Sequence, residues 1–174
     1  MNTLEAIAAR YSCRTYTNEQ ITEAELHTIL SVAGAAPNAA PHGTPHFSSM
    51  KLTVVQSPEM LKKLDDTMPG DLPTHGAPTA IIVSAIPEKG FGNELAMCNT
   101  GCVMENMAIA AADLGLASCY LFGIVRPIRD DRDLCRTLRI PDEFEPCSIL
   151  AVGHAASARS PRTLRPDHIS YDLI

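Results

Sequence analysis

Two arginines and a serine stand at alternate positions near the start of the chain. Arg10, Ser12 and Arg14 would share one face if the backbone between them is extended. Guanidinium groups meet phosphate oxygens in pairs, and a hydroxyl adds one more donor. This spacing is therefore compatible with a phosphate site. The alternative is a pair of surface arginines in ordinary ion pairs.

Two asparagines lie seven residues apart in an apolar stretch. Asn99 and Asn106 fall on one face of the helix expected over residues 95–115, with Cys102 between them. Uncharged amides among apolar side chains need hydrogen-bond partners, because an unpartnered buried amide is costly. They bond either to the ring edge of a bound cofactor or to the backbone of the core, and both alternatives stay open.

A predicted strand runs directly into a glycine at Cys119–Gly123. Glycine allows a backbone to approach a flat ligand closely, and N–H groups there can bond to ring heteroatoms. The alternative is a core strand that simply ends in a turn.

Metal and nucleophile motifs are poorly represented. Cys98 and Cys102 share a helical face, but no second Cys or His pair with zinc spacing follows. We find no glycine-rich phosphate loop and no serine elbow. A thiol or metal protein built on these two cysteines remains a rival interpretation. The six cysteines are scattered, several inside apolar runs, and this usage is typical of reduced, buried thiols in a cytosolic protein.

The elements that must position these residues alternate along the chain. Pro- and Gly-rich loops are expected at 37–45 and 68–78. Helices are expected over 3–9, after the capping box at Thr22–Glu25, after Ser57-Pro58, and over 95–115 and 126–138. Strands are expected over 51–56, 79–86, 118–122 and 147–153. This order predicts an α/β or α+β arrangement in layers.

Length and charge narrow the function further. The 174 residues fit a single domain, 1–174, and 45% hydrophobic residues suit a globular core. A net charge of −6 argues against a general nucleic-acid or anionic-membrane binder. No apolar run approaches the roughly 20 residues of a membrane span. The N-terminus shows no signal pattern, so we expect a cytoplasmic protein.

Taken together, the motifs resemble the nitroreductase family of FMN-dependent enzymes. Residues 6–16 look like the family's opening, where Arg10, Ser12 and Arg14 would hold the FMN phosphate, with Tyr11 between them. The basic tail would supply a further phosphate contact from Arg162 or Arg165.

The resemblance continues through the rest of the chain. Pro37, Asn38 and Ala39 correspond to a turn that approaches flavin bound mainly by the other subunit. Asn99 matches a position whose side chain meets the flavin ring. The family's flavin N5 edge faces the backbone of the stretch matched here by Tyr120, Leu121, Phe122 and Gly123.

Three features depart from the family's pattern. After the turn, the positions that often read Asn and then Gln-Pro-Trp hold Pro41, Gly43, Thr44 and Pro45, and the chain has no tryptophan. Only a short connection separates Ile86 from the central helix, where many relatives carry a longer excursion over the substrate. The tail lacks the usual Lys-x-Arg spacing.

The resemblance implies a three-layer α+β fold, a mostly antiparallel sheet flanked by helices, and a homodimer that exchanges C-terminal tails. It implies that NADH or NADPH reduces FMN and that a small electron-poor acceptor, such as a nitroaromatic or quinone, is then reduced. No catalytic side chain is expected, because the flavin carries the chemistry. The alternative is a flavin-binding or regulatory dimer without turnover.

Overall fold

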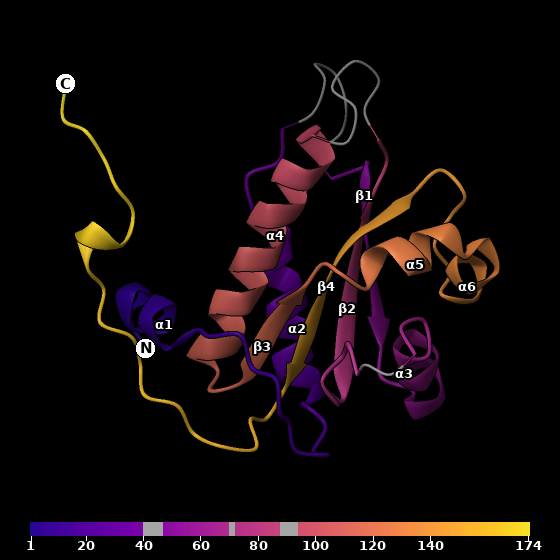
Figure 1. Ribbon diagram of the computed structural model, residues 1–174, viewed down its shortest axis with the longest axis horizontal. Coiled ribbons are helices and arrows are strands. Elements are labelled where there is room, and N and C mark those ends of the chain that lie inside the picture. The colour runs from indigo at the N-terminus through magenta and orange to yellow at the C-terminus, as the bar shows by residue number, and fades with distance from the viewer. Residues whose placement is uncertain (40–46, 70–71, 88–93) are drawn as a thin grey trace.

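A four-stranded antiparallel sheet forms the centre of the protein (Figure 1). The computed structural model describes residues 1–39, 47–69, 72–87 and 94–174. The strands are β1 (Met50–Val55), β2 (Thr79–Ala85), β3 (Ala117–Leu121) and β4 (Glu145–Gly153), in the spatial order β1-β2-β4-β3. Every neighbouring pair is antiparallel, so the fold is α+β rather than a parallel α/β sheet.

The two central strands are covered on both faces. All seven residues of β2 are buried, as are all residues of β4 after Glu145. Side chains at alternate positions of β2 enter different cores: Ile81 and Val83 face one, Ala80 and Ile82 the other. A strand buried on both faces needs a continuous apolar run, which is why the pattern at 79–86 has no polar alternation.

The first helical layer holds α2 (Glu23–Ala33) and α4 (Glu94–Asp113), which pack on each other and on the sheet. The predicted capping box is present: the Thr22 side chain accepts from the Glu25 N–H, and the Glu25 carboxylate accepts from the Thr22 N–H. The buried core between this layer and the sheet includes Ile29, Met104 and Met107.

The helix α4 differs from the expectation for residues 95–115. Only one face is buried, whereas Cys98 is exposed and Ile109 and Ala110 are half-buried. The sequence of residues 95–115 is apolar almost all round, which predicts a helix that runs through the core. In the single chain, this helix lies on the sheet and leaves an apolar outer face partly open.

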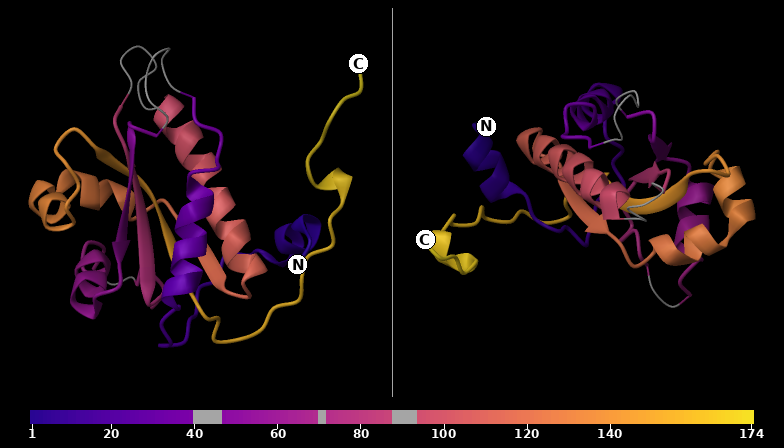
Figure 2. Two further views of the ribbon diagram at one scale, coloured as in Figure 1. Left: turned by 180° about the vertical axis from the view of Figure 1, so that it is seen from behind. Right: turned by 90° about the horizontal axis from the view of Figure 1, so that it is seen from above.

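The opposite layer holds α3 (Pro58–Asp65), α5 (Val125–Asp130) and α6 (Arg132–Thr137) (Figure 2). The prediction of one helix over 126–138 was wrong. Asp131 adopts an extended conformation and its carboxylate accepts from the Leu134 N–H at 2.9 Å, so it ends α5 and caps α6. The charged pattern at 126–138 predicts a surface helix, yet Ile128 and Cys135 are buried.

The two termini lie outside these layers. Helix α1 (Thr3–Ala9) packs against α4, and the chain after β4 passes α1 and extends away from the body, with a short 3-10 helix η1 (Pro166–His168) on the way (Figure 1). The last four residues, 171–174, are exposed. No helix among the described residues is long and apolar enough to cross a membrane.

Candidate functional site

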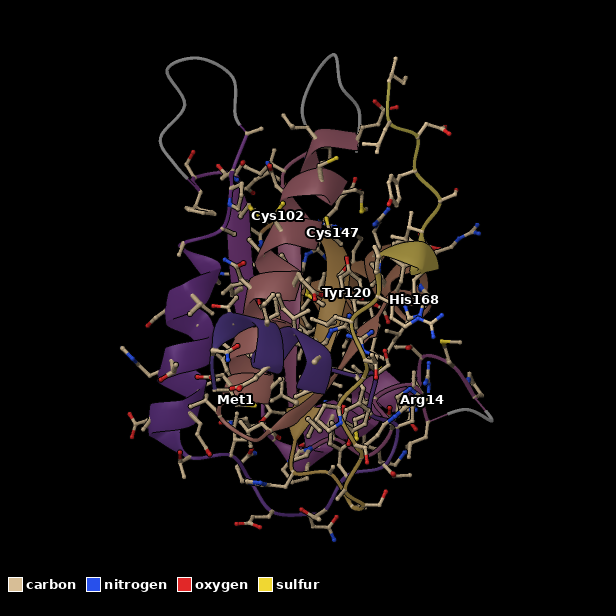
Figure 3. All side chains as sticks on the ribbon, turned by 90° about the vertical axis from the view of Figure 1, so that its left-hand side faces the viewer. Met1, Arg14, Cys102, Tyr120, Cys147 and His168 are labelled. Atoms are coloured by element: carbon tan, nitrogen blue, oxygen red, sulfur yellow. The ribbon has the colours of Figure 1, made fainter. Side chains whose placement is uncertain are left out.

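A cavity of about 740 Å³ lies where β3 ends and the N-terminal segment passes it. It joins Arg14 with the predicted stretch Tyr120, Leu121, Phe122 and Gly123. Figure 3 labels two of these residues, Tyr120 near the centre of the view and Arg14 below it to the right. The volume falls in the usual range for small-molecule and cofactor sites. The residues lining it are Arg14, Thr15, Tyr16, Asn18, Met68, Leu72, Pro73, His75, Gly76, Cys119, Tyr120, Leu121, Phe122, Gly123 and Ile124.

The strand end supplies aromatic side chains and a turn. Tyr120 is 42% exposed and Phe122 62% exposed, whereas Leu121 between them is buried in the core. The hydroxyls of Tyr120 and Ser148 hydrogen-bond at 2.9 Å. The Phe122 carbonyl accepts from the Val125 N–H, so the chain turns into α5 directly after the strand. This arrangement presents backbone and aromatic surface to a flat ligand.

The N-terminal segment that contains Ser12 and Cys13 pairs with β3. Cys13 N–H donates to the Ser118 carbonyl at 2.9 Å, and Ser12 forms an isolated parallel bridge with Ser118. Arg14 follows directly and is exposed at the cavity. The pairing with β3 thus fixes where Arg14 emerges.

Arg10 and Ser12 do not line this cavity. Arg10 is directed toward α4, where its Nε lies 3.3 Å from Glu105 Oε1. This Nε has no partner of good hydrogen-bond geometry, so the contact is an ion pair rather than an aligned hydrogen bond. The ion-pair alternative therefore describes Arg10 in the single chain, whereas Arg14 lies at a cavity.

The C-terminal tail brings two further arginines, Arg159 and Arg162, to the N-terminal segment. Arg162 Nη2 donates to the Ile7 carbonyl at 2.9 Å, and its backbone N–H donates to the Ala8 carbonyl at 2.9 Å. These carbonyls belong to the last turn of α1, whose C-cap is Arg10. Arg159 lies over the Tyr11 ring at 5.3 Å.

The tail contacts therefore place Arg162 next to the segment that carries Arg10 and Tyr11. Arg165 lies further along the tail, at the N-cap of η1. The choice between Arg162 and Arg165 as a phosphate contact stays a prediction.

A separate group forms at the N-terminal half of α4. Asn99 Nδ2 donates to the Ala39 carbonyl at 2.7 Å, and the Ala39 N–H donates to Asn99 Oδ1 at 2.9 Å. Asn38, which directly follows Pro37, accepts a hydrogen bond at Oδ1 from the Phe47 N–H. Asn106 lies about two turns beyond Asn99 along α4, outside this group, and its Nδ2 donates to the Val32 carbonyl at 3.2 Å.

Both amides thus bond to backbone in the single chain, as the core alternative requires. The ring contact of Asn99 stays a prediction, and so does the approach of 37–39 to a second subunit's flavin. The positions at Pro41, Gly43, Thr44 and Pro45, and most of the connection after Ile86, lie outside the described residues.

His75 lines the cavity although no sequence motif indicates it. It belongs to a segment expected only as a loop, and it adopts a left-handed backbone conformation with φ 56° next to Gly76 at φ 72°. Burial and then the Arg14 guanidinium lower the pKa of His75, and Asp65 opposes them. The only local sign of this turn in the sequence is Thr74-His75-Gly76, a polar residue, a histidine and a glycine just before the buried strand β2.

The cysteines form no metal centre within the part of the chain that the structure describes, where no three candidate ligands gather. All six thiols are free; Cys13, Cys119, Cys135 and Cys147 are buried. Burial raises the pKa of the Cys119 and Cys147 thiols, so both favour the protonated form.

The sequence matches a model described as the Nitroreductase family over residues 7–78 and 67–154. A protein of Methanothermobacter thermautotrophicus, provisionally named NADH dehydrogenase/NAD(P)H nitroreductase, is 32% identical over 173 residues, covering 97% of this chain and 86% of that protein. The FMN reductase (NADPH) of Bacillus subtilis is 28% identical, covering 92% of this chain and 70% of its own.

Solved structures share the fold. A nitroreductase with bound FMN from Desulfitobacterium hafniense superposes with a TM-score of 0.82 at 24% identity, covering 99% of this chain and 100% of its own. A nitroreductase family protein from Clostridium difficile superposes with a TM-score of 0.75 at 28% identity, covering 100% of both chains. The expected three-layer α+β fold is confirmed, and the chain belongs to the nitroreductase family.

Proposed function

We propose that this protein is an FMN-dependent oxidoreductase that oxidises NADH or NADPH and reduces a small electron-poor acceptor, such as a nitroaromatic or quinone. The observation that carries the proposal is the cavity that joins Arg14 to the end of β3. Relatives named for NAD(P)H nitroreductase and FMN reductase activity support it. When bound, FMN supplies the redox chemistry, taking up two electrons as hydride and passing them on.

The residues at the cavity fit this cofactor. Tyr120, Phe122 and the backbone at Gly123 offer a flat aromatic surface and N–H donors suited to a ring edge. Arg14 supplies a cation at the same cavity, and Arg10, Tyr11 and Ser12 on the preceding segment would extend the binding surface toward the phosphate. The protein's part is therefore to bind, orient and polarise the cofactor rather than to donate a proton or a nucleophile.

We also propose that the functional unit is a homodimer in which each flavin site takes residues from both chains. Asn38, Ala39 and Asn99 form a group separate from the Arg14 cavity, which suits a contribution to a partner's site. The partly open outer face of α4 and the exposed apolar tail, with Ile169 and Leu173, offer surface for such an interface. The six free thiols suit a reducing compartment, and we place the enzyme in the cytoplasm.

A visible spectrum of the purified protein tests the function. The protein is expected to be yellow, and anaerobic NADH or NADPH is expected to bleach its flavin bands. A flavin-binding or regulatory dimer without turnover would be yellow but would not bleach. A colourless protein whose melting temperature does not rise with added FMN would refute the proposal, because a ligand that binds only the native state stabilises it.

A further inference from the structure

The segment from Leu72 to Gly76 separates two cavities. His75 lines the Arg14 cavity of about 740 Å³. Thr74 lines a second cavity, of about 940 Å³, beside α3, and Leu72 and Gly76 line both. The second cavity contains none of the residues assigned to FMN above. The segment therefore forms a wall between the two cavities, and its conformation determines whether the His75 side chain faces the Arg14 cavity.

The backbone of this segment is held in a costly conformation. His75 has φ 56°, in the left-handed region that a non-glycine residue adopts at an energetic cost. Its N–H donates to the Leu72 carbonyl at 2.8 Å, and the Ala77 N–H donates to the Thr74 carbonyl at 3.1 Å. These bonds close a tight turn around His75. Such strain persists only where surrounding contacts over-determine it.

Asp65 supplies those contacts from the end of α3. Its Oδ1 accepts from the Thr74 N–H at 2.9 Å, and its Oδ2 accepts from the Thr74 hydroxyl at 3.0 Å. Thr74 is 1% exposed, so this paired contact is shielded from water. Bonds to an ionised acceptor are stronger than neutral ones. The Asp65 carboxylate therefore fixes Thr74, and Thr74 fixes the residue after it.

The imidazole so positioned shares its cavity with a permanent cation. Burial and Arg14 both hold the pKa of His75 below its ordinary value, which keeps the ring neutral at pH 7 despite Asp65. A neutral imidazole offers one N–H donor and one acceptor nitrogen. The edge of a flavin ring carries carbonyl and nitrogen acceptors together with an N–H donor, so a neutral imidazole complements it.

We infer that His75 contacts the ring of the bound flavin from the Leu72–Gly76 side of the cavity, and that Asp65 and Thr74 are its positioning residues. This inference rests on the proposed function and adds a ring contact that no sequence motif indicated. His75 is assigned to the ring because it lines the same cavity as Phe122 and Gly123. Arg14 lines that cavity as well, so the comparison of FMN with riboflavin below distinguishes a ring contact from a phosphate contact.

Titration of the full-length apoprotein with FMN and with riboflavin tests the assignment. His75→Ala is expected to raise the Kd for both ligands by a similar factor, about two- to tenfold, the size of one net hydrogen bond. It should also shift the visible absorption bands of bound FMN, because a group at the ring edge is lost. His75→Gln, which keeps a donor and an acceptor, should restore part of the affinity. His27→Ala, on the exposed face of α2, is the matched control.

The positioning role is tested by coupling. Asp65→Ala removes both acceptors of Thr74, and it should lower flavin affinity with the same spectral shift as His75→Ala. The double variant should be no weaker than the weaker single variant, because both changes remove one contact. Asp65→Asn, which keeps one acceptor oxygen, should fall between Asp65→Ala and the wild type.

The outcomes separate the two proposals. If the wild-type protein binds no FMN, the proposed function itself fails. If the wild type binds FMN but His75→Ala leaves both affinities and the spectrum unchanged, the ring contact is wrong. A loss confined to FMN would assign His75 to the phosphate and also overturn the inference. Additive losses in the double variant would show that Asp65 acts on stability rather than through His75.

Discussion

At the scale of single residues, Arg10 and Arg14, which alternate with Ser12 in the sequence, have different surroundings in the structure. Arg10 lies 3.3 Å from Glu105 on α4, whereas Arg14 lies at a cavity with the end of β3. Alternation in an extended segment predicts which side chains share a face, but not which of them finds a carboxylate on a distant helix. That contact depends on packing of α1 against α4, which the local pattern does not contain.

Arg14→Ala is expected to weaken FMN binding much more than riboflavin binding. Only FMN carries the phosphate, and a charge-assisted contact of this kind contributes about 1.5–3 kcal/mol, at least tenfold in affinity. Parallel titrations of the two ligands measure the difference. Arg126→Ala, whose side chain is 90% exposed on α5, is the control and should change neither affinity. Equal losses for both ligands would make Arg14 a structural residue.

The pKa of His75 predicts a dependence of stability on pH. Burial and Arg14 lower this pKa in the folded protein, so the unfolded chain binds the proton more readily near its ordinary pKa of about 6.5. Stability is therefore complete above that value and is lost as the pH falls through it toward the folded pKa. Urea unfolding at pH 7.5, 6.5 and 5.5 should show a shallower decline for His75→Gln than for the wild type. Parallel declines would contradict a lowered pKa.

At the scale of elements, Pro78 and Tyr16 lie so close to the end of β4 that we expect Gly153 not to tolerate a larger residue. A Cβ on Gly153 would lie 2.6 Å from Pro78 Cδ and 3.1 Å from Tyr16 Cδ1. Gly153→Ala should lower the free energy of unfolding by about 1–3 kcal/mol, the usual cost of overpacking. Denaturant melts measure it. Gly34→Ala, whose Cβ meets only an ordinary 3.7 Å contact, should cost much less, and equal costs would refute the crowding.

The elements themselves could be predicted wherever a local signal specified them. The capping box at Thr22 and the apolar run of β2 carry their own signals, and both elements are present. The break at Asp131 could not be predicted, because an aspartate within a charged helical pattern caps a new helix only when packing of Ile128 and Leu134 favours a change of direction. His75 was missed for a related reason: its left-handed conformation depends on Asp65, which is ten residues earlier in the chain.

At the scale of the whole molecule, the sequence indicated the layered fold, because the order and apolar character of its segments leave few ways to cover a sheet. The resemblance supplied the antiparallel arrangement. The course of the tail could not be read locally. Arg162 anchors it to the last turn of α1, and beyond that point its apolar side chains find little cover within the chain.

The exposed end of this tail predicts that dimerisation and flavin retention are linked. Ile169 is 80% exposed, Tyr171 67% and Leu173 92%, and a neighbouring chain would bury them. Deleting residues 165–174 should therefore lower the dimer fraction and the bound flavin together, because a site built from two chains is lost when they separate. Sedimentation velocity at micromolar concentration, recorded at the flavin and protein wavelengths, measures both. Replacing Ile169 and Leu173 by Ser keeps the tail's length and Arg165, so the same paired loss would assign the effect to apolar contacts. A truncated protein that sediments as a monomer with its full flavin would show that one chain suffices to build the site.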